Sequence, residues 1–301
     1  MIEKTFLIII QAVFLVILAP LISGIIHKLK NNLRMRKGAS VFQPYYNFVK
    51  LIAKDEVISR NTSWIFRATP VIVLGSVFCV CFLLPVLHKS FFLGPLGDML
   101  AVIFVFSLGR FFLALAALDA AGSFGGMGSS REVFIASFAE PATLVSIFVL
   151  GLNCGSLSPS AVASLEGWRF SSLLCGSALG MVALAETARI PVDNQETHLE
   201  LTMVHEAMVL EYSGRSLALL ELAAHIKQII FFTILSWVFF PCPVNAVWGW
   251  AWFIIKLCII SVFVAVTEIS LAKMRLFRVL DYLGFAFLIA ILSAVFALIG
   301  M

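Results

Sequence analysis

The stretch TFLIIIQAVFLVILAPLISGII, residues 5–26, contains no charged side chain and is almost wholly apolar. A helix needs roughly 20 mostly apolar residues to cross the hydrocarbon core of a bilayer, where lipid cannot satisfy exposed backbone groups. The stretch is too long for the apolar region of a secretory signal peptide, and no small-residue cleavage site follows it. It therefore predicts a retained membrane-spanning helix.

Similar segments recur along the whole chain. Hydrophobic residues make up 61% of the 301 residues and charged residues only 13%, whereas soluble domains usually carry about 45–50% apolar and about 25% charged residues. The eight expected spans run approximately over residues 5–26, 70–88, 99–118, 132–152, 171–188, 217–240, 247–267 and 279–300. The sequence therefore predicts an all-α, polytopic membrane protein in which residues 1–301 form a single transmembrane domain.

Lysine and arginine are unevenly distributed between the two sides of the expected spans. Fifteen fall in the loops of one side and three, Lys4, Lys89 and Arg169, on the other. Because Lys and Arg accumulate in cytoplasmic loops, we expect both termini on the outer side of an inner (plasma) membrane. Two cytoplasmic loops are long, at about 27–69 and 186–216. The first is basic, with an apolar stretch suited to an interfacial helix, and the second is acidic and suits a protein partner.

Several ionisable residues fall at or within the expected spans. Each costs about 2.5–3.5 kcal/mol on insertion scales, which makes it a functional candidate. The set is Arg110, Asp119, Glu132, Glu140, Glu186, Glu221, Lys227, Lys256 and Glu268. These residues suit a proton relay, but they also suit structural ion pairs between helices, and Arg110 and Asp119 fit the second interpretation best. Glu268 lies near the expected inner surface, where we expect it to be solvated.

Glu140 precedes a proline inside the fourth span. Pro141 is expected to kink this helix and to free carbonyl groups next to Glu140. Glu132, at the expected helix start, lies eight residues earlier, so the two carboxylates project about 80° apart. Glu186 lies where the fifth span meets the acidic loop. The hypothesis is that Glu140 and Glu186 bracket a hydrated path from the cytoplasm to the middle of the membrane.

The sequence offers little for metal or cofactor binding. None of the six cysteines forms a CxxC pair, whereas zinc and iron–sulfur sites use closely spaced thiolates. The segment with His198, Glu200, His205 and Glu206 also lacks the HExxH pattern, because Val209 stands where the second histidine would be. We expect no metal and no cofactor in this chain, and no catalytic residue.

One stretch carries a family signature. Ala185-Glu-Thr-Ala-Arg-Ile-Pro-Val-Asp193, followed by Glu196, Glu200-Leu201 and Glu211-Tyr-Ser-Gly214, resembles the signature of the complex I subunit 1 family. Arg36-Lys-Gly38 with Gln43 and Lys50, and Gly128-Ser-Ser-Arg-Glu132, resemble the R-x-G loop and the serine-rich loop of the same family. The resemblance covers essentially the whole chain, including eight spans and outside termini.

Departures from the signature narrow the choice within the family. Val192 replaces the usual Phe, His198 replaces an acid, Ala39 replaces Pro, and about four extra residues separate Leu201 from Glu211. These features are similar to the membrane subunit of group 4 energy-converting nickel–iron hydrogenases, the group of hydrogenase-4 component C and formate hydrogenlyase subunit 4.

That resemblance implies a role in a larger complex. The chain would anchor the soluble hydrogenase large and small subunits and the iron–sulfur subunits, which hold the nickel–iron and iron–sulfur centres, to antiporter-like membrane subunits, with lipid around it and no nucleic acid. The expected docking residues are Arg36, Gln43, Lys50 and Arg189. The expected proton-coupling residues are Glu132, Glu140, Glu186, Asp193, Glu196, Glu200, Glu211, Glu221, Lys227 and Lys256.

Three alternatives stay open. A quinone-site subunit of a complex I-type NADH dehydrogenase would share the fold and use the same polar region for a quinone headgroup. An independent transporter is disfavoured because no inverted repeat is apparent. An inert structural anchor would need no relay at all.

Overall fold

The structure is a computed structural model that describes residues 2–59, 61–86, 97–165, 167–193, 204–241 and 249–300. Regular secondary structure in these ranges is entirely helical. The predicted coupling residues Glu196 and Glu200, together with His198, lie outside the described residues.

Within the described ranges, eight long helices overlap the eight expected spans. They are α1 (Ile2–Leu33), α3 (Trp64–Leu83), α4 (Met99–Asp119), α5 (Ser123–Cys154), α7 (Phe170–Glu186), α9 (Gly214–Phe239), α10 (Gly249–Ser270) and α11 (Leu276–Ile299). Seven of them are long and apolar enough to cross a membrane, and α7 is shorter, with 17 residues. The predicted all-α, polytopic membrane fold is therefore confirmed. Three short helices, α2 (Gln43–Ile52), α6 (Pro159–Ala163) and α8 (His205–Val209), lie between the long ones.

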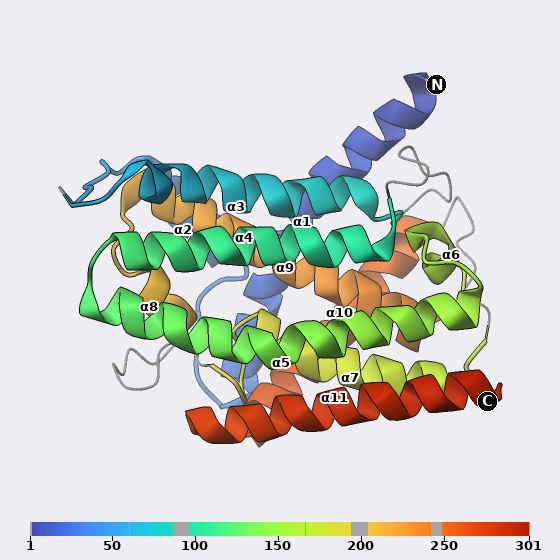
Figure 1. Cartoon of the computed structure of the whole chain (residues 1–301). Coiled ribbons are helices and arrows are strands. Elements are labelled where there is room, and N and C mark those ends of the chain that lie inside the picture. The colour runs from blue at the N-terminus through green and yellow to red at the C-terminus, as the bar shows by residue number, and fades with distance from the viewer. Residues whose placement is uncertain are drawn as a thin grey trace.

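The long helices form one bundle (Figure 1). Helices α3, α4, α5, α7 and α11 run side by side across the view, while α1 crosses behind them at a slant. Both ends of the chain lie at the right-hand end of the bundle with α6, and α2 and α8 lie at the opposite end. We call the end with α2 and α8 the inner end, because the lysine and arginine distribution predicts that it faces the cytoplasm.

Helix α5 begins earlier than the sequence predicts. The expected span starts at Glu132, where the family resemblance implies the end of a serine-rich loop, but α5 starts at Ser123 and continues through Pro141 to Cys154. The glycines before Glu132 serve close packing. A Cβ atom on Gly125 would lie 2.5 Å from the Ala117 carbonyl oxygen of α4, and one on Gly128 would lie 2.9 Å from the Ala207 Cβ atom of α8. Glu132 therefore lies within the helix, close to α4 and α8.

Helix α9 lies at the centre of the bundle. It contacts α1, α2, α3, α7 and α10, and it contributes most of its apolar side chains to the largest core cluster. Phe231 of α9 stacks against Phe106 of α4 with ring centroids 5.5 Å apart. Because α9 is enclosed, its polar side chains Glu221, Lys227 and Gln228 must be accommodated inside the protein.

Candidate functional site

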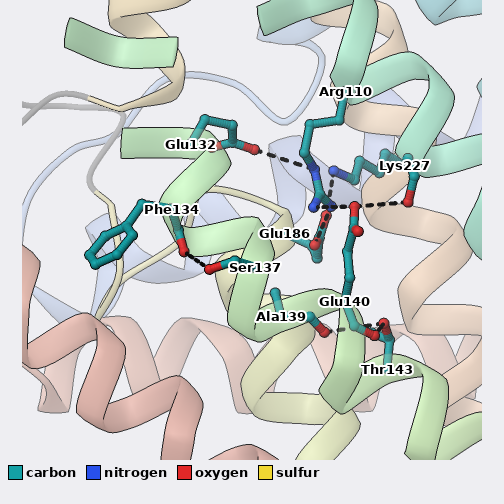
Figure 2. Close-up of polar contacts among 10 residues, drawn as sticks. Arg110, Glu132, Phe134, Ser137, Ala139, Glu140, Thr143, Glu186 and Lys227 are labelled. Atoms are coloured by element: carbon teal, nitrogen blue, oxygen red, sulfur yellow. Dashed lines mark hydrogen bonds and ion pairs between the residues drawn. The ribbon is translucent and has the colours of Figure 1, made fainter. Parts of the chain in front are cut away.

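A single arginine of α4 gathers carboxylates from two neighbouring helices (Figure 2). Arg110 Nη1 lies 3.0 Å from Glu140 Oε1 and Arg110 Nε lies 3.6 Å from Glu132 Oε1, both on α5. Arg110 Nη2 donates to Glu186 Oε1 at the end of α7. One guanidinium can reach two residues of α5 because they lie about two helical turns apart and because α5 packs against α4.

A second cation completes this Arg110 cluster. Lys227 of α9 places its Nζ atom 2.7 Å from Glu186 Oε2 and 5.9 Å from the centre of the Phe106 ring. Ser107 Oγ donates to Glu140 Oε1 at 2.8 Å. The cluster therefore contains three carboxyl groups and two cations. With all groups ionised it carries one excess negative charge in a largely apolar bundle.

The Arg110 cluster lies between two cavities. The larger has a volume of about 460 Å³ and extends from the cluster to the inner end, where its wall includes Ser40, Gln43 and Asn47. The smaller, of about 20 Å³, lies against Glu140, Ser107 and the apolar interior of α4, α7 and α9. Since a water needs about 10–15 Å³ of such space, the smaller cavity has room for one. Arg110 and Glu186 line both cavities.

A second buried cluster lies on another wall of the larger cavity. Arg189 Nη1 lies 2.9 Å from Glu268 Oε1 of α10, and Lys30 Nζ of α1 lies 3.1 Å from Glu268 Oε2. Arg189 Nη2 also donates to Gln228 Oε1 at 2.9 Å. Glu268 is only 3% exposed, so the expectation that it is solvated is wrong. Its two cations compensate its burial and tie α1 and α10 to the segment after α7.

Comparison with known proteins decides the family. The family model described as NADH dehydrogenase matches residues 5–299. The chain belongs to the NADH dehydrogenase family. Among its relatives, hydrogenase-4 component C of Escherichia coli (strain K12) is 29% identical, over 97% of this chain and 95% of the relative. Formate hydrogenlyase subunit 4 of the same organism is 29% identical, over 89% and 90%.

More distant members are similar over less of the chain. NADH-quinone oxidoreductase subunit 8 of Rhodothermus marinus is 27% identical, over 73% of this chain and 66% of the relative.

A solved chain in the membrane-bound sulfane sulfur reductase, an archaeal respiratory membrane complex, has a TM-score of 0.83 at 18% identity. It covers 96% of this chain and 99% of its own length. That likeness shows the fold alone.

The three charged residues of the signature stretch 185–193 each meet a different partner. Glu186 belongs to the Arg110 cluster, and Arg189 belongs to the Glu268 cluster. Asp193 Oδ1 lies 2.7 Å from Lys273 Nζ, while its Oδ2 accepts from the backbone N–H groups of Val204 and His205 at 3.3 Å. Asp193 therefore holds the start of α8 and lies apart from the Arg110 cluster.

Arg189 lies in a different place from the one the sequence predicts. The sequence places it on a docking surface, but it is 4% exposed and its guanidinium contacts groups inside the bundle. Arg36, Gln43 and Lys50 are exposed, as docking would require. Gln43 Nε2 donates to Asn47 Oδ1 at 3.0 Å on the same face of α2.

The other predicted coupling residues that the structure describes, Glu221, Glu211 and Lys256, lie in three separate places. Glu221 lines the larger cavity on α9, beside Glu206 of α8, which is not among the predicted coupling residues. Glu211 is exposed in the connection between α8 and α9, and its carboxylate packs close to Gly122. Lys256 is buried elsewhere and donates to the Phe240 carbonyl oxygen at 2.6 Å. Of the predicted coupling residues that the structure describes, only Glu132, Glu140, Glu186 and Lys227 come together around Arg110.

Arg110, the residue at the centre of this cluster, is missing from the predicted site. Sequence reasoning identifies it as an intramembrane charge but interprets it as one partner of a structural pair. Its depth in the membrane span could have indicated this position. An arginine near the middle of an apolar span needs several carboxylates or carbonyls around it. Within the described ranges, no three His, Cys, Asp or Glu side chains are arranged to hold a metal ion.

Proposed function

We propose that this chain is the membrane-anchoring and proton-coupling subunit of a membrane-bound nickel–iron hydrogenase complex of the formate hydrogenlyase type. Its similarity to hydrogenase-4 component C and formate hydrogenlyase subunit 4 along nearly the whole chain supports this choice. In the proposal, partner subunits carry the nickel–iron and iron–sulfur centres, and this chain connects them to antiporter-like membrane subunits.

The observation that carries the coupling role is the position of the Arg110 cluster between two cavities. Water in the larger cavity would bring protons from the inner end to Glu132 and Glu186, which line it. Glu140 lines the smaller cavity on the far side of Arg110. In the proposal, a proton that arrives through this water passes between the carboxyl groups of the cluster as the water around them changes.

Glu140 also supports a membrane partner beside α5. Its side chain is 36% exposed at the surface of this chain, although it lies within a helix that is long and apolar enough to span the membrane. A carboxyl group facing lipid at that depth costs several kcal/mol by insertion scales, about 2.5–3.5. A neighbouring subunit with a polar group would remove that cost and receive the proton, which is the role we assign to an antiporter-like subunit.

The soluble arm is proposed to dock at the inner end. Arg36 and Gln43 are exposed in the connection between α1 and α3, and Glu211 is exposed in the connection between α8 and α9. A rim of mixed charge suits a protein partner with complementary charges. Movement of the arm could then alter the width and hydration of the larger cavity, which opens beside Gln43 and Asn47.

Affinity purification of the tagged chain from membranes tests the assignment. The expected result is co-purification of a nickel-containing hydrogenase large subunit, identified by mass spectrometry, together with antiporter-like subunits. Co-purification of a nucleotide-binding NADH-oxidising module would assign the chain to a complex I-type enzyme instead. Recovery of the chain without any redox partner would contradict the proposal.

A quinone-site subunit is the second candidate. The larger cavity falls within the usual range of small-molecule sites, about 300–1,000 Å³, and the similarity to NADH-quinone oxidoreductase subunits is clear although more distant. A photoreactive quinone analogue separates the two candidates. Labelling of residues that line the larger cavity, competed by quinone, would support the quinone site, and absence of labelling would leave the hydrogenase assignment.

A further inference from the structure

A single apolar ring lies at the boundary between the two cavities beside the Arg110 cluster. Among the residues that the structure describes, three line both cavities, and these are Phe106, Arg110 and Glu186. Phe106 precedes Arg110 by four residues on α4, so both side chains lie on one face of that helix. Where the two cavities approach each other, the Arg110–Glu186 ion pair is therefore accompanied by one benzyl side chain.

Two residues of α9 contact the Phe106 ring from different cavities. Phe231, which lines the smaller cavity, stacks on the ring with centroids 5.5 Å apart and planes 12° from parallel. Lys227, which lines the larger cavity, places its Nζ atom 5.9 Å from the ring centre. Aromatic stacking and a cation within about 6 Å of a ring centre are both favourable contacts. Only 8% of Phe106 is exposed, so the ring is packed against its neighbours and held in place.

Each cavity offers polar groups to water, whereas the Phe106 ring offers none. The wall of the larger cavity includes Glu132, and the wall of the smaller includes Ser107, Glu140 and Thr143. Buried water persists where it makes hydrogen bonds to such groups, and apolar spaces stay dry. Apolar constrictions in channels likewise stop conduction by excluding water. The ring therefore opposes a continuous line of water between the two cavities.

The ion pair beside the ring leaves few groups for water. Glu186 Oε1 accepts from Arg110, and Glu186 Oε2 lies 2.7 Å from Lys227 Nζ. Arg110 Nη1 lies 3.0 Å from Glu140 Oε1. Because these charged groups already satisfy one another, a line of water would have to pass through the space that the Phe106 ring fills.

We propose that Phe106 is a barrier to water between the two cavities. In that role it is a positioning residue, because it acts on the water around the Arg110 cluster and not on the proton itself. A proton that arrives through the larger cavity then crosses by way of the carboxyl groups and does not run past them along water. This consequence for coupling rests on the proposed function, whereas the barrier itself rests on the ring and the cavities.

Radiolytic footprinting of the complete complex measures the barrier without using proton movement. A short X-ray pulse converts water to hydroxyl radicals, which oxidise the side chains beside that water, and mass spectrometry gives the rate at each residue. Ile147 and Leu179 line the smaller cavity and report on its water. Phe106→Gln and Phe106→Leu replace the ring by side chains of similar size, one polar and one apolar. The oxidation rate at Ile147 and Leu179 should rise severalfold in Phe106→Gln and stay near the wild-type rate in Phe106→Leu.

A ring elsewhere on α4 supplies the matched control. Phe104 is 64% exposed on the same helix, and Phe104→Ala should leave the rates at Ile147 and Leu179 unchanged. Phe106→Ala is a second opening variant, and it decides the question if Phe106→Gln does not assemble. Wild-type rates in an assembled opening variant, an equal rise in Phe106→Leu, or loss of assembly in both opening variants would each overturn the inference.

Proton movement per turnover then separates the barrier from the proposed function. In liposomes, an opening variant with raised oxidation rates should move fewer protons per turnover of the soluble arm than the wild type does. Raised oxidation with unchanged coupling would contradict the role of the barrier in coupling. Absence of proton movement in the wild-type complex would contradict the proposed function instead, and the footprinting result would still decide whether Phe106 excludes water.

Discussion

The guanidinium of Arg110 lies 3.0 Å from the carboxylate of Glu140, and this contact joins the buried centre of the chain to its lateral surface. Arg110 has only 9% of its side chain exposed, whereas Glu140 has 36%. Glu186, on the other side of the same guanidinium, is almost fully enclosed. Arg110 therefore holds an inner carboxylate and a lateral carboxylate within reach of one charge, and the proposed proton transfer rests on this arrangement.

Removing Arg110 should be damaging because three carboxyl groups would lose their shared partner. Loss of one partner of a buried ion pair typically costs about 3–5 kcal/mol, so we expect Arg110→Gln to lower the yield of assembled complex and its thermal stability sharply. Arg67→Gln, which removes an exposed arginine from α3, is the control and should behave like the wild type. Equal stability of the two variants would show that the Arg110 cluster contributes little to folding.

The glycines at the start of α5 give a paired test of close packing. Gly128→Ala places a Cβ atom 2.9 Å from Ala207 and 3.0 Å from the Val204 carbonyl oxygen. Overpacking of this kind costs about 1–3 kcal/mol, and the thermal midpoint of the chain should fall. Gly126→Ala, in the same helix with nothing within 4 Å, should instead stabilise it by about 0.5–1 kcal/mol. A fall of the midpoint in both variants would argue against this account of the segment.

Glu268 should be essential for the second cluster. Glu268→Gln takes from Arg189 and Lys30 the carboxylate that they share, and we expect a loss of about 3 kcal/mol or more in stability. Adding Lys30→Met removes one of the two cations and should recover part of that loss. Asp281→Asn, at an exposed acid of α11, provides the matched control. Failure of Lys30→Met to improve the Glu268→Gln variant would mean that the two cations do not depend on the same carboxylate.

Tyr212 predicts a dependence of stability on alkaline pH. Its ring stacks on Phe66, its hydroxyl donates to the Phe66 carbonyl oxygen at 3.0 Å, and burial raises the pKa of its phenol. Unfolding therefore releases a proton once the pH exceeds the ordinary tyrosine value of about 10. Stability should fall as the pH rises from there towards the higher folded-state pKa. Tyr212→Phe should cost about 1 kcal/mol at neutral pH and show a smaller decline above pH about 10.

The fold was predictable because lipid imposes a length and an apolarity on every spanning helix. All eight expected spans coincide with helices, and the largest error was the start of α5. The expected span started at Glu132, and the glycines and serines at 123–131 before it have low helix preference in isolation. Tertiary packing against α4 and α8 outweighs that preference, and no local pattern shows which glycines face a neighbouring backbone.

The site was predictable only as a set of candidates. Intramembrane charge identified Glu132, Glu140, Glu186 and Lys227, but the same criterion also selected Lys256, which lies elsewhere. Which charges meet depends on the packing of α4, α5, α7 and α9 in three dimensions, and spacing within one helix cannot specify that. Arg189 shows the same limit of sequence reasoning. It was expected in a loop, and the structure places it inside the bundle.

The most direct test of the account is proton translocation by the Glu140→Gln variant. The complete complex is reconstituted into liposomes, and proton movement is followed with a pH-sensitive dye while the soluble arm turns over an artificial electron carrier. Glutamine keeps the hydrogen bond from Ser107 possible and removes the titratable group. Asp281→Asn is the control for a lost carboxylate outside the Arg110 cluster. The account predicts at least about a tenfold loss of translocation, equivalent to about 1.4 kcal/mol on the barrier, with the chemistry of the soluble arm unchanged. Translocation at the wild-type rate in Glu140→Gln would contradict the account.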